Sequence, residues 1–213
     1  NFQIISFLGD GTNNRAIDQT GNSKFQPDLL LTRATAGSHP GFFDAARGVK
    51  KSIRASTTDA EVTSSVNRDI DSFDSDGYTV SASQAIDTNT GSYTEIGWMW
   101  HAGNTSASNE DGTINTTTTI SDATSGISIG TYTGTGSNAT VGHGLGVAPQ
   151  LVVIRARDQS GQNWVVLHPA IANTQYLSFD SDSAAATSSL VWNNTSPTST
   201  VVSIGTGGWV NDN

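Results

Sequence analysis

The sequence predicts an all-β protein made of two tandem antiparallel β-sandwich domains of jelly-roll or lectin-like type. Ser and Thr are abundant whereas good helix formers are scattered, short alternating apolar segments recur between turn residues, and these segments repeat once along the chain. The 213 residues include 5 Trp, 7 Phe and 4 Tyr, so we expect packed cores rather than a disordered chain.

The repeat is visible as a series of matched segments. Residues 4–11 match residues 129–136, each with an aromatic residue two positions before a Gly-x-Gly sequence. Residues 25–33 match residues 147–155, where a Pro-led turn enters a continuous apolar strand that ends in Arg. The further matches are 40–44 with 164–168, 48–53 with 172–177, 78–81 with 202–205 and 85–89 with 209–213. Such self-similarity indicates two copies of one structural unit.

Short strands are expected in both copies, as in antiparallel sandwiches. In the first copy they fall near residues 2–8, 27–33, 40–44, 49–54, 77–82 and 93–101. In the second copy they fall near residues 127–133, 149–156, 163–168, 174–179, 189–193 and 200–205. Residues 59–67 and 181–189 have room for one helical turn each. In the strand at 93–101, Trp98 and Trp100 share one face and Met99 lies on the other, and we expect both Trp side chains to be mainly buried.

These elements predict a first domain at residues 1–103, a Thr/Ser/Asn-rich linker at 104–126 and a second domain at 127–213. Residues 113–120 are β-prone and are a candidate edge strand. The second copy stops before the counterpart of the strand at 93–101, and the sequence does not begin with Met. We therefore expect these residues to be part of a longer polypeptide. The missing strand of the second sandwich would come from later sequence or from a neighbouring chain, because an unpaired edge is a liability.

The amino-acid composition limits the classes of partner that the protein can bind. Lys and Arg number 10 against 19 Asp and Glu, a net charge of −9, so no basic surface is available to neutralise nucleic-acid phosphates. No apolar stretch approaches the roughly 20 residues that a membrane-spanning helix requires, so no membrane insertion is expected. The absence of Cys excludes disulfides and thiolate chemistry. We expect no cofactor and no catalytic residue.

Three polar motifs have a structural and a functional interpretation. Residues 142–146, Gly-His-Gly-Leu-Gly, resemble a phosphate-binding loop, but Pro149 and a strand follow instead of a helix, which favours a turn. Asp74 and Asp76, with Asp69, Asp71 and Gly77 beside them, are the candidate ligands for Ca²⁺. Their spacing covers only part of a calcium loop and is also typical of a tight turn. The histidines show no zinc-type spacing and are interpreted as turn or surface residues: His39, His101, His143 and His168.

Aromatic side chains next to amides are the candidate ligand-binding residues. Trp192 and Trp209, with Asn194, are predicted to be exposed and to stack on sugar rings. The competing interpretation is that these Trp side chains belong to the core or to an interface.

Several phrases of the sequence resemble repeated β-domains in tail-fibre-like structural proteins of marine tailed bacteriophages. They are residues 132–136, 141–149 and 151–155 of the second copy, and residues 43–48, 72–78 and 98–103 of the first. The first copy departs from the pattern at residues 19–25, which replace Gly-His-Gly-Leu-Gly. The second copy lacks the Asp-Ser-Asp-Gly phrase and the final strand.

The resemblance implies a non-enzymatic virion component displayed on the particle surface, a fibre or appendage subunit with a use in host attachment. Its partners would be other virion subunits in a homo-oligomer, and host-surface glycan. The alternatives are a carbohydrate-binding lectin-like module and a capsid-decoration or filament-coating protein. A depolymerase or glycosidase ranks last, since it would need two carboxylates about 5 to 10 Å apart in a groove.

Overall fold

The computed structural model describes residues 1–21, 23–36, 39–64, 69–82, 88–103 and 106–212. It divides into two compact units, the first made of Asn1–Ala55 with Glu61–Gly103 and the second of Ser56–Ala60 with Asn104–Asn213. Antiparallel strands make up nearly all the regular structure, and the described residues contain two helices of four residues each. The all-β prediction is confirmed. Neither helix is long and apolar enough to cross a membrane.

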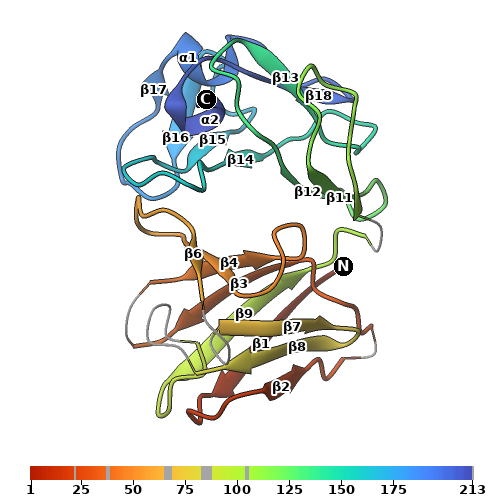
Figure 1. Ribbon diagram of the computed structural model, residues 1–213, viewed down its shortest axis with the longest axis vertical. Helices are drawn as coiled ribbons and strands as arrows, with labels where there is room; N and C mark the ends of the chain where they lie inside the picture. Colours follow the sequence, from red (N-terminus) through yellow and green to blue (C-terminus); the bar gives the residue numbers. More distant parts are fainter. Residues whose placement is uncertain (22, 37–38, 65–68, 83–87, 104–105, 213) are drawn as a thin grey trace. The chain divides into compact units, whose positions relative to one another are not determined.

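The first unit consists of two antiparallel sheets, coloured red to yellow-green in Figure 1. The six-stranded sheet has the order β1 (Phe2–Leu8), β9 (Thr94–Trp100), β3 (Leu29–Ala34), β4 (Gly41–Asp44), β5 (Lys51–Arg54) and β6 (Val62–Thr63). The three-stranded sheet has the order β2 (Arg15–Asp18), β8 (Gly77–Ser81) and β7 (Asp69–Asp74).

The core of the first unit lies between these two sheets. Leu30, Phe43 and Met99 from the larger sheet pack with Tyr78 and Val80 from the smaller, and each is at most 1% exposed. Burial of such a side chain contributes about 1.5–3 kcal/mol to folding. Because side chains alternate along a strand, the residues between these core positions point to the opposite face of each sheet.

The second unit contains three smaller sheets and both helices, coloured green to blue in Figure 1. The first sheet has the order β14 (Val152–Ile154), β15 (Val165–Leu167), β16 (Gln175–Ser178) and β17 (Ala186–Thr187). The others are the pair β13 (Ala139–Gly142) with β18 (Val201–Ile204), and the hairpin sheet β10 (Ser106–Ala107), β11 (Thr118–Asp122) and β12 (Ile127–Thr131). The helices are α1 (Ser189–Trp192) and α2 (Gly208–Asn211). Trp192, Val191 and Ile204 are fully buried in the core of the second unit.

Four strand pairings of the first unit have counterparts in the same register in the second. Phe42 lies opposite Ile53 in β4–β5, and Val166 lies opposite Leu177 in β15–β16. The sequence match aligns Phe42 with Val166 and Ile53 with Leu177, so the pairs coincide. The sequence match gives the same agreement between β3–β4 and β14–β15. The pairs in β5–β6 coincide with those in β16–β17, and the pairs in β2–β8 with those in β13–β18, when each residue is compared with the one 124 positions later.

A buried asparagine makes the same contacts in each unit. The Asn89 side chain accepts a bond from the amide of Asp10 and donates to the carbonyl of Thr12, while its own carbonyl accepts from Gly11. The Asn211 side chain accepts from the amide of Thr135 and donates to the carbonyl of Ser137, and its carbonyl accepts from Gly136. Gly11 and Gly136 both have positive φ, of 71° and 67°. The structural counterpart of Asn89 is therefore Asn211, two residues before the position given by the sequence match.

Several expected elements differ from the structure. The strand expected at residues 189–193 is helix α1, because the Ser188 hydroxyl caps it by accepting the Leu190 amide and Asn193 ends it in the left-handed conformation. β6 and β17 occupy parts of the two segments expected to hold a helical turn. Strands β2, β7 and β13 and helix α2 were not expected. The segment interpreted as a linker contributes β10 and β11 to the second unit, and β11 pairs with β12 where an edge strand was a candidate.

Candidate functional site

The outer face of the six-stranded sheet carries an aromatic patch. Phe2 lies opposite Trp100, which lies opposite Leu29, and Ile4, Trp98 and Leu31 form the next row. Residues opposite each other in a sheet share a face, and this face is opposite to that of Met99. The outer-face patch consists of Phe2, Ile4, Leu29, Leu31, Phe42, Trp98 and Trp100.

The patch is accessible at its β1 end. Phe2 is 48% exposed and Ile4 is 57% exposed, and the other members are half-buried. The rings of Phe2 and Trp100 lie 5.1 Å apart at 35°. Trp98 and Trp100 face outward, because Met99 between them faces the core, yet neighbouring side chains cover most of both rings. Such a flat aromatic surface suits the apolar face of a sugar ring or an apolar partner surface.

A buried ion cluster supports β4 next to this patch. The Arg47 guanidinium donates to Asp44 Oδ2 at 2.5 Å, to Glu61 Oε2 at 3.0 Å and to the Phe42 carbonyl at 3.0 Å. The three charged side chains are at most 10% exposed. Removing one member of such a cluster leaves a buried charge without compensation, so the cluster fixes the conformation of the turn that follows β4.

The predicted sugar-binding residues are not brought together. Trp192 is 0% exposed and part of the core, so its predicted exposure is wrong. Helix α1 turns Trp192 inward, while Asn194 lies outside the helix and is exposed with φ of 51°. Trp209 is half-buried, with its ring 5.7 Å from that of Tyr176.

The candidate calcium ligands have protein partners. Asp74 accepts from Ser72 Oγ at 2.7 Å and from Thr79 Oγ1 at 2.8 Å, and Asp76 pairs with Lys24 at 3.3 Å. Asp74 lies opposite Gly77 across the β7–β8 hairpin, which confirms the tight turn. In the part of the chain that the structure describes, no three His, Asp or Glu side chains are grouped closely enough to hold a metal ion.

The other carboxylates of this cluster are also occupied. Asp69 accepts from Ser64 and Thr88, and Asp71 pairs with Lys50 and accepts from Ser81. These contacts connect β7 to its surroundings, which gives the acidic segment a structural use.

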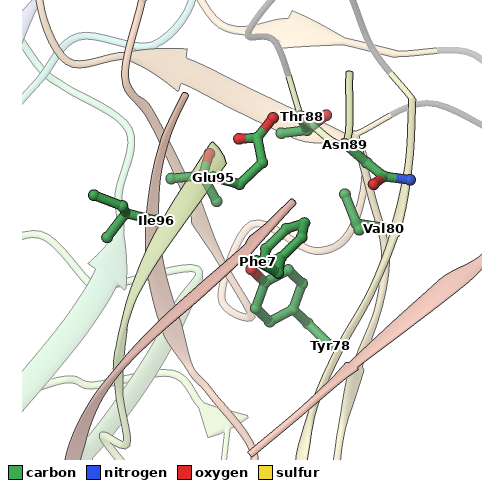
Figure 2. Close-up of a pocket in the computed structure, with 8 residues that line it drawn as sticks. Phe7, Tyr78, Val80, Thr88, Asn89, Glu95 and Ile96 are labelled. Atoms are coloured by element: carbon green, nitrogen blue, oxygen red, sulfur yellow. The ribbon is translucent and has the colours of Figure 1, made fainter. Parts of the chain in front are cut away.

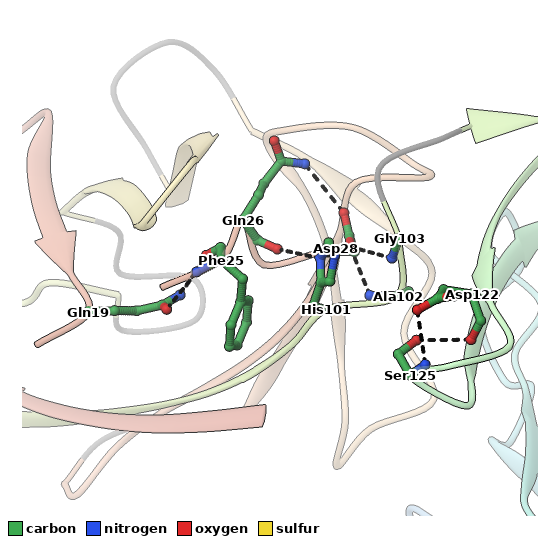
Figure 3. A network of polar contacts seen from close by, with 9 residues as sticks. All are labelled: Gln19, Phe25, Gln26, Asp28, His101, Ala102, Gly103, Asp122 and Ser125. Atoms are coloured by element: carbon green, nitrogen blue, oxygen red, sulfur yellow. Dashed lines mark hydrogen bonds and ion pairs between the residues drawn. The ribbon is translucent and has the colours of Figure 1, made fainter. Parts of the chain in front are cut away.

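One histidine belongs to a buried polar network that sequence reasoning missed. His101 Nδ1 lies 2.9 Å from Asp28 Oδ2, and Asp28 is fully buried. The same oxygen accepts the amides of Ala102 and Gly103 at 2.8 and 3.0 Å, and Gln26 donates to Asp28 Oδ1 (Figure 3). This network fixes the chain after β9 against the start of β3. No sequence signal could reveal it, because the partners are far apart along the chain.

Gln19 and His143 have corresponding positions directly after β2 and β13. The amide of Gln19 donates to the Asp76 carbonyl, and that of His143 donates to the Thr200 carbonyl. Gln19 exchanges two side-chain bonds with the Phe25 backbone, and His143 Nδ1 accepts the Leu145 amide. His143 is 8% exposed and lies in the coil after β13, so of the two alternatives, turn or surface residue, the surface one does not apply. The glycine segment at 142–146 leads into coil, as the turn interpretation predicted.

A small gap lies inside the first sandwich (Figure 2). Its lining residues are Phe7, Thr32, Tyr78, Val80, Thr88, Asn89, Glu95 and Ile96. It leaves no room for a water molecule. The Tyr78 hydroxyl has no hydrogen-bond partner among the described residues, and burial together with the nearby Glu95 charge raises the pKa of Tyr78. The gap is a packing feature rather than a ligand site.

Comparisons with known proteins give one result. The family model described as a domain of unknown function, DUF7483, matches residues 1–213. No curated protein and no solved structure matches the chain.

Proposed function

The chain belongs to the DUF7483 family, a domain of unknown function, and we propose that it is a non-enzymatic structural subunit of a bacteriophage virion. In this proposal it forms part of a fibre or appendage on the particle surface, assembles as a homo-oligomer and contributes to host attachment. The observation that supports it best is the set of four strand pairings with the same register in both units. Serial β-units extend a protein by repetition, which suits a displayed filament.

The phrases that resemble phage structural proteins lie on the framework of the units. Residues 72–78 contain the turn of the β7–β8 hairpin, and residues 98–103 contain the end of β9 and the amides bound by Asp28. Residues 43–48 contain the Asp44–Arg47 pair. The resemblance therefore concerns the residues that build the fold, which supports a shared architecture and transfers no catalytic residue.

Immunogold electron microscopy tests this proposal. An antibody raised against residues 1–213 should label fibres or appendages of particles purified from the source culture, and preincubation of host cells with the purified chain should slow particle adsorption. Label confined to the capsid shell or to a filament surface would favour the decoration or coating alternative. An antigen that remains in the cell fraction with unlabelled particles would contradict a virion role.

Carbohydrate binding at the outer-face patch is the second candidate. The exposed Phe2 ring next to Trp100 favours it, because aromatic faces stack on the C–H face of sugars. A glycan array should then give signals that Phe2→Ser lowers at least 10-fold, while Asn115→Ala, at an exposed position in the other unit, leaves them unchanged. Signals that persist in Phe2→Ser would exclude this patch as the sugar site.

A further inference from the structure

We propose that the free edge of β14 is a strand-acceptor site, which binds an extended antiparallel segment with the side-chain pattern of β9. This inference concerns a partner of the second unit and does not depend on the virion role. The segment would have aromatic or large apolar residues on one face and an apolar residue between them on the core face.

The first unit supplies the template for this site. β3 lies between β4 and β9, so Leu30 has Phe43 on one side and Met99 on the other and is 0% exposed. Trp100 and Trp98 lie opposite Leu29 and Leu31 and leave these two side chains half-buried. Both edges of β3 are therefore paired. Side chains of β9 also lie next to those of β3 on both faces of the sheet.

The equivalent strand of the second unit has one partner. By sequence match and by register, Leu29, Leu30 and Leu31 correspond to Leu151, Val152 and Val153. β14 pairs with β15, and no other described strand pairs with it. Leu151 is 59% exposed and Val153 is 40% exposed, while Val152 and Ile154 are half-buried against the core.

Apart from its short length, this edge lacks the features by which proteins protect an unpaired strand. Lys and Pro are absent from β14, and its register with β15 has no bulge. Charged residues, Pro and bulges are the usual protection against unwanted pairing. Its short length is one remaining restraint, and pairing would lengthen it toward the six residues of β3.

A peptide with the sequence of residues 93–103 is the probe. Fluorescence anisotropy measures its binding to the full chain, and hydrogen exchange locates it. We expect saturable binding and slower amide exchange at residues 151–155, with exchange at residues 29–34 unchanged because β9 already occupies that edge. A peptide of the same composition in which the residues at positions 95 and 99, Glu and Met, are exchanged should bind at least 10-fold more weakly, because it places the carboxylate at the core position of Met99.

A matched pair of chain variants completes the test. Val153→Lys places a charge on the exposed edge and should weaken peptide binding at least 10-fold, whereas Val147→Lys, at a residue that is 64% exposed and outside the strand, should not. Binding without protection at 151–155, or binding unaffected by Val153→Lys, would overturn the proposal. So would a dimer of the free chain in which residues 151–155 are already protected, because a second copy would then be the occupant.

Discussion

The first unit has β9 between β1 and β3, whereas in the second unit β14, the counterpart of β3, pairs with β15 alone among the described strands. The shared pairings keep the same register, so what flanks this strand is a difference between two otherwise comparable sets of strands. The consequence is visible in the exposed fractions: Leu30 is fully buried, but Val152 is only half-buried. One strand therefore decides whether the apolar surface of this sheet is covered.

One set of buried polar contacts is shared by the two units. The asparagine contacts made by Asn89 and Asn211 are the same although the surrounding core side chains differ. A buried amide needs all of its hydrogen-bond partners, so its geometry tolerates little change, whereas apolar residues of similar size can replace one another.

Removal of the largest core side chain of the second unit should have the largest effect. Trp192→Ala is expected to lower the unfolding free energy of that unit by about 3–5 kcal/mol, because it leaves a cavity at a fully buried position. Chemical denaturation followed by residue-resolved NMR checks this. The first unit has its own core, so equal destabilisation of both units would contradict the separation of the two cores.

Variants at the two buried asparagines test whether the two units depend on the same contacts. Asn89→Ala and Asn211→Ala should each cost about 1–3 kcal/mol in their own unit, because each leaves buried backbone groups without partners. The control is Asn115→Ala, at an exposed position, which should change the unfolding free energy by less than about 0.5 kcal/mol. A large loss in one unit and none in the other would show that the two contacts are not equivalent.

Two tyrosine variants compare the stability contribution of a hydrogen-bonded hydroxyl with that of a hydroxyl without a partner. Tyr132→Phe should cost about 0.5–1.5 kcal/mol, since the Tyr132 hydroxyl donates to the Val210 carbonyl at 2.6 Å. Tyr78→Phe should leave stability unchanged or raise it by up to about 1 kcal/mol, because the Tyr78 hydroxyl has no partner among the described residues. Thermal unfolding of both variants measures this, and a larger loss for Tyr78→Phe would contradict the assignment.

The smallest effect is a pH dependence shared by the units. Amide donation from Thr12 lowers the pKa of Asp10, and amide donation from Thr124 and Ser125 lowers the pKa of Asp122, in each case below 3.8. A lowered folded-state pKa means that the contribution to stability is present above pH 3.8 and is lost as the pH falls through the folded pKa. NMR titration of the two carboxyl carbons should give midpoints below 3.8 in the folded chain, and midpoints at or above it would refute these contacts.

Sequence reasoning succeeded where a single segment contains the information. The alternation of apolar and polar residues predicted β1 and β9. It also predicted that Met99 and its two Trp neighbours lie on opposite faces of the sheet. The prediction failed at α1, because a short apolar run such as Leu190 to Trp192 is compatible with a strand and with a helix. The capping residues at its two ends determine that it is a helix. The strand β7 was missed, because its sequence is rich in Asp, which is typical of turns.

The candidate sites were harder to predict because they depend on contacts between distant segments. The pairs Asp28–His101 and Arg47–Glu61 have no spacing that marks them in sequence. The outer-face patch required the register of three strands, whereas the sequence gives only the alternation within each. The inward direction of Trp192 followed from a helix that was expected to be a strand.

Amide hydrogen exchange on the free, monomeric chain is the most direct test of the difference between the units. The account predicts slow exchange throughout residues 29–34, and fast exchange at those amides of residues 151–155 that point away from β15. Equal protection of the two segments would mean that β14 already has a second partner, and the open edge would not exist.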